Sequence, residues 1–357
     1  MEQLLRDWNG ESVVIRYDRP TDAWIFIAIH DRTLGMAMGG CRLKIYPSAR
    51  DGLRDALRLA EGMTFKWAAI DFPFGGGKAV LAPARPLGPE EREGLLLRFG
   101  DLVESLGGAY GTGVDLGTAP VDMDVVGRRT SRVFGRSPEH GGAGDPGIYT
   151  ALGVLAGIRA ACAAVFDSTS LEGRRVLVQG VGGVGAPLAR GLAEAGARVL
   201  VTDALPQRAI DVAGEVGAEV VAPESAYETA CDIFSPCAIG GVLNARSIPR
   251  LRCRIVAGSA NNQLEEEADA VRLHERGILY APDFVVNAGG AIAHGALEML
   301  GWSRDRVEAR VKAIGETLAE IFADAERRAE SPLPGAISRA ERVLGAARRG
   351  TRDAAAG

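Results

Sequence analysis

The sequence predicts an α/β protein with two domains, the second of which is built on a doubly wound parallel sheet. Its 357 residues are about twice the length of an ordinary single domain. Hydrophobic residues make up 47% and charged residues 24% of the chain, which is the balance of a globular protein and not of a disordered one. From about residue 147 onward, short apolar runs alternate with helical periodicity, a pattern typical of parallel βαβ units. We expect one domain at 1–145, a second at 146–329, and a C-terminal helix at about 330–357 that packs back on the first.

The elements of the first domain are predicted from its residue patterns. Runs rich in β-branched and aromatic residues predict strands, and a hairpin is expected around Arg19-Pro20. Apolar residues at i, i+3, i+4 and i+7 predict a helix. In chain order we expect strands at 12–17 and 24–30, a helix around 53–60, a glycine turn at 72–78 leading into a strand at 78–81, a helix at 89–106, a strand before Asp115, and a helix from the N-cap Thr118 to about Gly135.

The second domain begins after a glycine-rich stretch at 141–147, which indicates a hinge. The strands expected after it are short and apolar, as in a sheet buried on both faces. In chain order we expect a helix at 149–165, a strand at 175–179, a helix at 184–195, strands at 198–202, 219–221, 232–235, 255–257 and 278–280, and helices at 290–300 and 305–328, while the residues from 348 onward are expected to fray.

The composition excludes several classes of protein. A total of 41 Lys and Arg against 46 Asp and Glu gives a net charge of −5, so nothing favours a nucleic acid or an anionic membrane as a partner. The four histidines and five cysteines form no HExxH, CxxC or Cys/His cluster, so we expect no metal site and reduced, mostly buried thiols. The polar first residues do not resemble a signal peptide. Apolar runs such as 23–29 fall short of the roughly 20 residues that span a bilayer. We therefore expect a cytoplasmic protein.

The motif Gly180-Val-Gly-Gly-Val-Gly185 predicts a dinucleotide site. It follows one predicted strand and opens a helix, and Asp203 ends the next strand. In this setting Gly180 permits the turn, Gly182 lets the backbone approach a pyrophosphate, and Gly185 permits close packing of helix and strand. Asp203 would accept hydrogen bonds from the adenosine ribose and repel a 2′-phosphate, which favours NAD over NADP. The alternative is a glycine-rich turn that holds no ligand.

Three side chains of the first domain are candidates for chemistry. Lys66 and Lys78 lie among apolar and aromatic residues, whereas lysines usually occupy solvated faces. Two partly buried ammonium groups lower each other's pKa, so that one can act as a base and the other can hold a carboxylate. Asp115 follows a strand-like segment, where its side chain could project into a cleft. Snorkelling lysines and a turn or capping aspartate are the alternatives.

At these residues the chain resembles the amino acid dehydrogenase family of glutamate, leucine, valine and phenylalanine dehydrogenases. The resemblance covers roughly 16–323, and the motifs occur in the order that the family shows. The stretches that carry it are Ile27-Ala-Ile-His-Asp-Arg-Thr-Leu-Gly35, Met38-Gly-Gly-Cys-Arg42, Gly62-Met-Thr-Phe-Lys66, Gly75-Gly-Gly-Lys78, Thr112-Gly-Val-Asp115, Val121-Asp-Met-Asp124, the GxGxxG motif, Ser235-Pro-Cys-Ala238, Ala257-Gly-Ser-Ala-Asn-Asn-Gln263 and Ala281-Pro-Asp-Phe-Val-Val-Asn-Ala-Gly-Gly290.

The resemblance implies a reversible oxidative deamination, in which an L-amino acid, NAD⁺ and water give a 2-oxo acid, ammonia and NADH. It implies an N-terminal α/β substrate and oligomerisation domain, a Rossmann-type NAD-binding domain, a cleft between them, and a homo-oligomer assembled through the N-terminal domain. Lys66 would bind the substrate carboxylate, and Lys78 would be the low-pKa lysine that activates water and polarises the carbonyl. Asp115 would exchange protons with the amino and imino nitrogen.

The resemblance also implies the binding residues. The substrate would be flanked by Gly39 and Gly40, with Asn287 near its amino group, and its side chain would meet Met63, Val114, Ala291 and His294, with Met38 as further apolar wall. The residues expected to hold NAD are Thr150, Gly180, Gly182, Gly183, Val184, Gly185, Asp203, Cys237, Ala238, Ala260, Asn262 and Asn287.

The side chain of the substrate is predicted less directly. No additional lysine is placed to grip a second carboxylate, which argues against glutamate. The stretches 134–137 and 299–303 resemble phenylalanine-specific members, whereas 27–35 resembles leucine-specific ones. His294 departs from the expected aliphatic residue, and it is either a core histidine or tunes the pocket toward a polar or aromatic side chain. We expect a phenylalanine-like or branched-chain substrate. The alternatives are another amino acid, such as tryptophan in a specialised pathway, and a catalytically silent NAD-binding regulatory protein.

Glycine is the unusual count in the composition. The chain holds 47, about 13% of its residues against a usual share of about 7%. Such an excess reflects flexible linkers or places where backbone turns tightly or approaches a ligand. We assign 39–40 and 75–77 to the approach of substrate, 180–185 to the pyrophosphate, 289–290 to the nicotinamide and 141–147 to the hinge.

Overall fold

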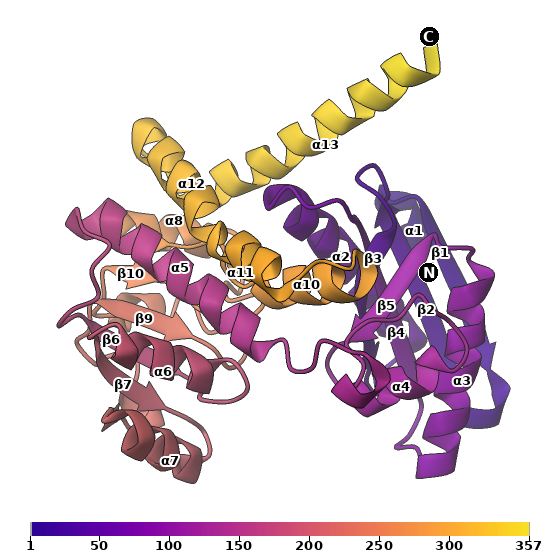
Figure 1. Ribbon diagram of the computed structural model, residues 1–357, viewed down its shortest axis with the longest axis horizontal. Coiled ribbons are helices and arrows are strands. Elements are labelled where there is room, and N and C mark those ends of the chain that lie inside the picture. Colours follow the sequence, from indigo (N-terminus) through magenta and orange to yellow (C-terminus); the bar gives the residue numbers. More distant parts are fainter. Residues whose placement is uncertain (1, 357) are drawn as a thin grey trace. The chain divides into compact units, whose positions relative to one another are not determined.

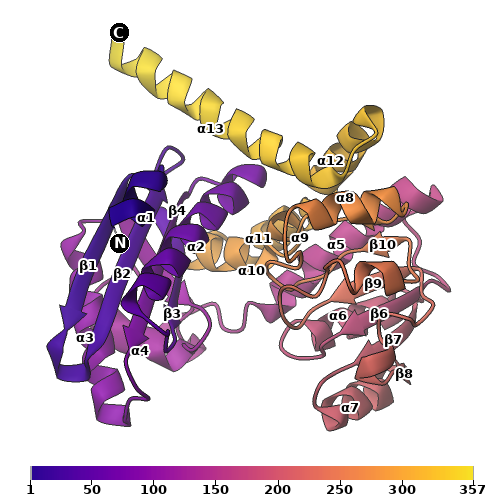
Figure 2. The same ribbon diagram turned by 180° about the vertical axis from the view of Figure 1, so that it is seen from behind.

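The computed structural model describes residues 2–356, with side chains through residue 350. The chain forms two compact units, which are described separately. Unit 1 comprises the chain up to Gly144, the segment His294–Gly301 and the chain from Arg339 onward, and unit 2 comprises Asp145–Ala293 and Trp302–Ser338. The predicted α/β class is confirmed in both units (Figures 1 and 2).

Unit 1 is built on a five-stranded sheet with strand order β1-β2-β4-β3-β5. Strands β3, β4 and β5 run parallel to one another, whereas β2 is antiparallel to both β1 and β4. Its elements are α1 (Glu2–Asp7), β1 (Ser12–Asp18), η1 (Arg19–Thr21), β2 (Ala23–Asp31), β3 (Ala37–Leu43), α2 (Ala49–Ala69), β4 (Gly75–Pro83), α3 (Pro89–Ser105), β5 (Tyr110–Val114), α4 (Pro120–Gly127) and η2 (Pro138–His140).

The two faces of this sheet bury different helices. On one face Val80 of β4 packs with Leu53 and Leu57 of α2. On the other face Leu81 packs with residues of α3 and α4, among them Phe99. Successive side chains of a strand point to opposite faces, so Lys78 lies on the α2 face with Val80.

The prediction for 72–78 was wrong in one respect, because Gly75, Gly76 and Gly77 belong to β4 and do not form a turn. A Cβ atom on Gly76 would lie 1.9 Å from the Thr64 hydroxyl of α2, and one on Gly77 would lie 2.8 Å from the Tyr110 ring. The glycines therefore let α2 and β5 approach the strand, because their Cβ positions face protein atoms.

The helix predicted from Thr118 to Gly135 is shorter than expected. Helix α4 ends at Gly127, and its N-cap is Ala119, with Pro120 as the first helical residue. The Thr118 hydroxyl instead donates to the backbone carbonyl of Cys41 at 2.9 Å. The chain after α4 returns to the sheet through a bridge between Thr112 and Val133. Strand β3 was not predicted at all, since two adjacent glycines interrupt its pattern.

Unit 2 contains a six-stranded parallel sheet in the order β11-β10-β9-β6-β7-β8. Counted from β6, this is the 3-2-1-4-5-6 order of the dinucleotide-binding doubly wound fold. Its elements are α5 (Gly147–Phe166), β6 (Arg175–Gln179), α6 (Gly185–Glu194), β7 (Arg198–Thr202), α7 (Pro206–Val216), β8 (Glu219–Val220), η3 (Pro223–Ser225), β9 (Ile233–Pro236), η4 (Ile248–Arg250), β10 (Ile255–Val256), α8 (Ala268–Glu275), β11 (Leu279–Tyr280), α9 (Asp283–Val286), α11 (Arg304–Lys312) and α12 (Ile314–Arg328).

Three further elements include residues of unit 1. Helix α10 (Gly289–His294) continues into the π-helix η5 (Gly295–Met299). Helix α13 (Pro332–Ala356) follows α12. The residues from 348 onward, which were predicted to fray, are therefore helical as far as Ala356. From α13, Arg339 donates to the carbonyl of Ala69 at 2.9 Å, and Arg348 pairs with Asp31.

Helix α5 is a long and strongly apolar helix, extending the helix predicted at 149–165 by two residues at its start and one at its end. Its 20 residues have a mean hydropathy of 1.7 over the most apolar window, and among the described residues it alone could cross a membrane by length and composition. Within unit 2 it packs against α6 and α12. Such packing is typical of the central helix of a folded domain.

Candidate active site

The predicted catalytic pair of unit 1 is joined by an ion pair. The ammonium nitrogen Nζ of Lys78 on β4 lies 3.0 Å from Oδ2 of Asp115. Asp115 directly follows β5, and its backbone N–H donates to the Thr118 hydroxyl at 2.9 Å. A third residue completes the cluster, since Arg42 of β3 places its Nε 3.0 Å from the same Oδ2 atom.

The three strands explain why these side chains converge. Cys41 of β3 pairs with Ala79 of β4 on one side and with Val114 of β5 on the other. Each charged residue is next in sequence to one of these paired residues: Arg42 follows Cys41, Lys78 precedes Ala79, and Asp115 follows Val114. The strand register therefore brings the three charges together. Sequence reasoning quoted Arg42 in a family motif and gave it no role.

The charges of this cluster set the protonation state of the carboxylate. Burial alone would raise the pKa of Asp115, but the positive charges of Lys78 and Arg42 outweigh it and lower the pKa to about 2. Burial raises the pKa of the neighbouring Cys41 thiol above its usual range, so this cysteine stays protonated and neutral. Asp115 is therefore an ionised acceptor at neutral pH.

The glycines predicted to flank the substrate lie against this cluster. A Cβ atom on Gly40 would lie 2.8 Å from Cβ of Asp115, and one on Gly39 would lie 1.8 Å from the carbonyl oxygen of Gly77 and 3.3 Å from Cγ of Met63. Any side chain at either position would displace backbone. Both glycines are required by the packing of β3, whatever they do for a substrate.

Lys66 lies in the last turns of α2. The helix is held against β3 there, because the Trp67 indole donates to the carbonyl of Met38 at 3.2 Å. Lys66 is half-buried and Met63 lies one turn before it on the same helix. The predicted carboxylate-binding lysine and the predicted pocket methionine thus come from one helix, which covers the face that carries Lys78.

Two of the residues predicted for the substrate side chain, Val114 and His294, form a wall in unit 1 together with Phe134 and Gly135. The Cβ position of Gly135 is 3.2 Å from Cγ2 of Val114 and 3.2 Å from Cε1 of His294. The rings of Phe134 and His294 are 5.9 Å apart. His294 is buried, and its Nε2 lies 3.2 Å from the carbonyl oxygen of Gly144, so we assign the proton to Nε2.

Sequence reasoning missed the carboxylate that holds this wall. Glu298 of the π-helix accepts hydrogen bonds from the backbone N–H groups of Gly135 at 3.0 Å and Ala143 at 2.9 Å. It thereby fixes both ends of the segment that includes Gly135 and leads to Gly144. A π-helix turn is a frequent feature of functional sites.

The glycine motif of unit 2 lies where the strand order reverses, between β6 and β9. A Cβ atom on Gly180 would lie 2.6 Å from Cβ of Ala238, and one on Gly185 would lie 1.8 Å from the carbonyl oxygen of Gly180. Cys237 donates its backbone N–H to the carbonyl of Gln179 at 2.7 Å. The loops after β6 and β9 are therefore packed tightly together at the point where such folds bind dinucleotides.

The same edge of the sheet offers groups that fit a dinucleotide. A Cβ atom on Gly182 would meet no atom within 4 Å, so the backbone there is open to a ligand. The side-chain oxygens of Gln179 and Thr202, at the ends of β6 and β7, are buried and have no hydrogen-bond partner within the described chain. Buried polar atoms are normally satisfied, and a bound polar ligand at this edge would satisfy them. The residues present thus fit the cofactor.

The other predicted cofactor residues fall into two groups. Asp203 accepts hydrogen bonds from the backbone N–H groups of Val181 and Leu205, both at 2.9 Å, which fixes its carboxylate beside the motif. Asn287 donates to the side chain of Asn261 at 2.8 Å and to the carbonyl of Ser259 at 3.2 Å. The remaining members lie on loops or helix starts of unit 2: Thr150 on α5 and in contact with the Cβ position of Gly290, Gly183 beside Gly147, Val184 before α6, and Ala260 and the exposed Asn262 after β10. Ala291, which was predicted for the substrate pocket, lies on α10 of the same unit.

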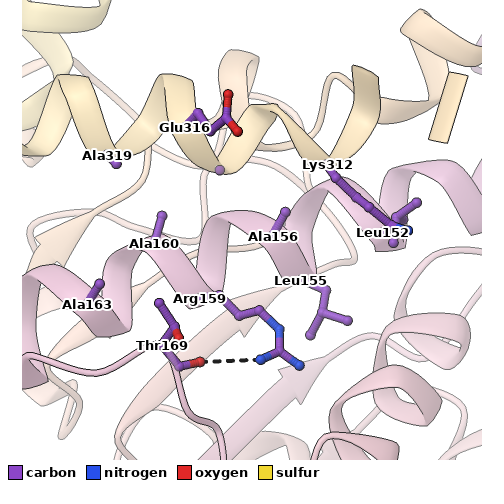
Figure 3. A pocket seen from close by; sticks show the side chains of 11 residues that line it. Leu152, Leu155, Ala156, Arg159, Ala160, Ala163, Thr169, Lys312, Glu316 and Ala319 are labelled. Carbon is purple, nitrogen blue, oxygen red and sulfur yellow. Dashed lines mark hydrogen bonds between the residues drawn. The ribbon is translucent and has the colours of Figure 1, made fainter. Parts of the chain in front are cut away.

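A cavity of about 590 Å³ lies elsewhere in unit 2, between α5 and α12 (Figure 3). Leucine and alanine side chains such as Leu152 and Ala160 line it, and Arg159 donates to the carbonyl of Thr169 at 3.4 Å. None of the predicted site residues lies in it. Over residues 2–350, whose side chains are described, no group of three or more His, Cys, Asp or Glu side chains is arranged to hold a metal ion.

The fold of unit 2 is that of a dinucleotide-binding domain, and comparison with known proteins places the chain in a family of pyridine-nucleotide-dependent oxidoreductases that act on amino acids. Residues 206–349 match the model of the Glutamate/Leucine/Phenylalanine/Valine dehydrogenase family, and residues 21–132 match the dimerisation domain of the same family. The chain belongs to this family, as the resemblance predicted.

Individual relatives differ in the amino acid that their names specify. The chain is 42% identical to a leucine dehydrogenase of Geobacillus stearothermophilus over 91% of this chain and 88% of that protein. It is also 42% identical to a phenylalanine dehydrogenase of Caldalkalibacillus thermarum, over 91% and 89%. The structure of L-tryptophan dehydrogenase from Nostoc punctiforme matches with a TM-score of 0.85 and 38% identity, covering 98% of this chain and 100% of that one.

Proposed function

We propose that this protein catalyses the NAD-dependent, reversible oxidative deamination of an apolar L-amino acid, phenylalanine-like or branched-chain, to its 2-oxo acid and ammonia. The observation that carries the proposal is the ion pair between Lys78 and Asp115, at 3.0 Å, on the face of the sheet that α2 covers. Deamination requires a base that takes a proton from water and a carboxylate that exchanges a proton with the substrate nitrogen, and here the two groups are in contact. A catalytically silent regulatory protein would have no need of this pair.

The roles proposed for unit 1 follow from charge and position. Lys66 would hold the substrate carboxylate as a point charge. Lys78 would take a proton from the water that attacks the imino carbon, and Asp115 would accept a proton from the substrate nitrogen and return it to departing ammonia. When bound, NAD supplies the hydride acceptor. The ion pair and the close backbone packing at Gly39 hold Lys78 and Asp115 in a fixed orientation. A fixed orientation lowers the entropic part of the activation barrier.

The wall around His294 supports an apolar and bulky side chain. Val114 and Phe134 supply aliphatic and aromatic surface, and the wall formed by Val114, Phe134, Gly135 and His294 contains no lysine or arginine. A second carboxylate, as in glutamate, would therefore lose its hydration without a partner. His294 also donates a hydrogen bond within the wall, so it is a satisfied buried histidine. Its ring still adds aromatic surface, and tryptophan stays an open alternative to phenylalanine.

The test is a panel of twenty L-amino acids with NAD⁺, followed by the absorbance of NADH. We expect the highest kcat/KM for phenylalanine or a branched-chain amino acid, and at least about a hundredfold less for glutamate, since a buried unpaired carboxylate costs several kcal/mol. A maximum at tryptophan would keep the chemistry and change the substrate. If none of the twenty produces NADH, the proposal is wrong.

For the cofactor we propose NAD in preference to NADP, because Asp203 carries its negative charge beside the glycine motif. We expect NADH to bind at least about tenfold more tightly than NADPH, and Asp203→Asn to reduce that ratio by removing the repulsion of the 2′-phosphate. Titration of the nucleotide fluorescence measures both affinities. Asp211→Asn on the exposed side of α7 is the control. Equal affinities for the wild-type protein would contradict the role of Asp203.

We also propose a homo-oligomer assembled through the N-terminal domain, which the match of residues 21–132 to a dimerisation domain supports. Light scattering that gives the mass of one chain at micromolar concentration would contradict it.

A further inference from the structure

Arg42 connects two carboxylates of unit 1 that have different surroundings. Its Nε donates to Oδ2 of Asp115 at 3.0 Å, and its Nη1 donates to Oδ2 of Asp55 on α2 at 2.9 Å. Asp55 accepts two further hydrogen bonds, from the Tyr46 hydroxyl at 2.6 Å and from Arg58 at 2.9 Å. Arg42 is therefore fixed from the α2 side independently of Asp115.

The side chains of this network are mostly withdrawn from water. The exposed fraction is 17% for Arg42, 19% for Asp115 and 8% for Lys78. In such surroundings a carboxylate that loses its cation is strongly destabilised, because neither water nor another charge compensates it. Lys78 and Arg42 contact the same oxygen of Asp115, so each can compensate its charge when the other does not.

The two cations differ in one property that matters for catalysis. A guanidinium keeps its proton throughout the physiological pH range, whereas an ammonium can release it. If Lys78 were the sole partner of Asp115, release of its proton would leave the carboxylate without compensation, and the pair would resist deprotonation. With Arg42 in place, Asp115 retains a positive partner while Lys78 is neutral.

We propose that Arg42 is a positioning residue that compensates the charge of Asp115 and thereby allows Lys78 to release its proton during the reaction. The proposal rests on the proposed function, since it assigns Lys78 a working proton. It goes beyond that function because it assigns a role to Arg42, the third charged residue of the cluster. The other charged or titratable groups around the cluster include Cys41 on β3, Tyr110 on β5, and Asp122 on α4, which pairs with Arg92 of α3. From the side of α2 they include Lys66, Asp55 and Arg58, together with Tyr46, whose hydroxyl donates to Asp55.

The first measurement does not depend on turnover. The chain contains four lysines, at 44, 66, 78 and 312, so selective ¹³Cε-lysine labelling gives four NMR signals, and the Lys78 signal is assigned by its loss in Lys78→Arg. In Arg42→Gln we expect the Lys78 signal to titrate about one pH unit or more higher than in the wild type, because removal of a nearby cation favours the protonated form. An unchanged titration would overturn the proposal, whether or not any amino acid is oxidised.

The second measurement is the pH profile of kcat/KM for the best substrate of the panel. The limb that rises with pH should move in the same direction in Arg42→Gln, with kcat about a hundredfold lower as one acid–base group is impaired. Arg42→Lys, which keeps the charge, should restore the limb in part, and it replaces the glutamine variant if that does not fold. Absence of activity in the wild type would count against the proposed function, and the NMR titration would still decide the role of Arg42.

Asp55→Asn separates this role from a purely structural tie between β3 and α2. It removes the contact between Arg42 and Asp55 and leaves the contact with Asp115. Since it removes a negative charge, it should not move the Lys78 titration to higher pH. If Arg42→Gln and Asp55→Asn lower the Tm alike and leave both titrations where they are in the wild type, Arg42 is only a structural tie.

Discussion

Replacement of Lys78 by alanine is expected to lower kcat by about 10³-fold, the range for the loss of a positioned acid–base group. Alanine cannot accept a proton from water, and no other amine lies among the contacts of Asp115, whose remaining cation is the permanently charged Arg42. Initial rates of NADH formation with the best amino acid of the panel measure the effect. The affinity for NADH should stay within about twofold, since the glycine motif belongs to the other unit.

Lys312→Ala is the matched control for this prediction. Lys312 is exposed on α11 and lies 3.8 Å from Glu308, one turn away. Such surface pairs contribute at most about 1 kcal/mol, so this variant should keep wild-type kcat and NADH affinity. Retention of more than about a tenth of the wild-type kcat in Lys78→Ala would show that another group supplies the base, because a missing base ordinarily costs at least a hundredfold. The roles of Lys78 and Asp115 would then have to be reassigned.

The sequence singled out Lys66 and Lys78 as candidates because their surroundings are apolar, and in the structure Lys66 is half-buried and Lys78 is buried. Lys78 is buried in the middle of β4, where an unpaired charge would be costly. A second signal was available and unused. The chain has four lysines among 41 basic residues, so basic positions on its surface are filled almost entirely by arginine. A lysine at a buried position of this chain therefore indicates a role that needs a side chain able to release its proton.

Arg42 shows what local pattern could not predict. Its strand, β3, has two adjacent glycines in its short sequence. Arg42 pairs with Asp115, which lies 73 positions further along the chain. The contact arises from the parallel pairing of β3 with β5, which is a property of the sheet and not of either segment. Glu298 is a similar case, because its partners are backbone N–H groups 155 and 163 positions away. Backbone donors leave no trace in a sequence.

The glycines show, within one residue type, both what the sequence could predict and what it could not. Composition indicated that many of them serve close approach, which is correct, but it could not say what approaches. At 75–77 the neighbours are side chains and backbone of unit 1, whereas at Gly182 no protein atom lies within 4 Å of the Cβ position. The distinction depends on what stands opposite each Cα atom, and only the folded chain provides that information.

This distinction predicts opposite results for two glycines of one motif. In Gly185→Ala the new methyl group would lie 1.8 Å from the carbonyl oxygen of Gly180, so the free energy of unfolding should fall by about 3 kcal/mol, at the upper end for overpacked sites. In Gly182→Ala the methyl group meets nothing and the backbone is not left-handed. Its stability should change by less than about 0.5 kcal/mol, while its affinity for NADH should fall at least about tenfold because the methyl group occupies the space of the pyrophosphate.

Gly214→Ala provides the reference for both variants. Gly214 lies inside α7 of the same unit, and its Cβ position is open as well. Alanine is favoured over glycine within a helix by about 1 kcal/mol, so this variant should be slightly more stable than the wild type and should bind NADH unchanged. Urea unfolding and NADH fluorescence titrations on the three variants separate stability from affinity. If Gly182→Ala binds NADH as tightly as Gly214→Ala does, the ligand does not approach the backbone at Gly182, and the open space there has another cause.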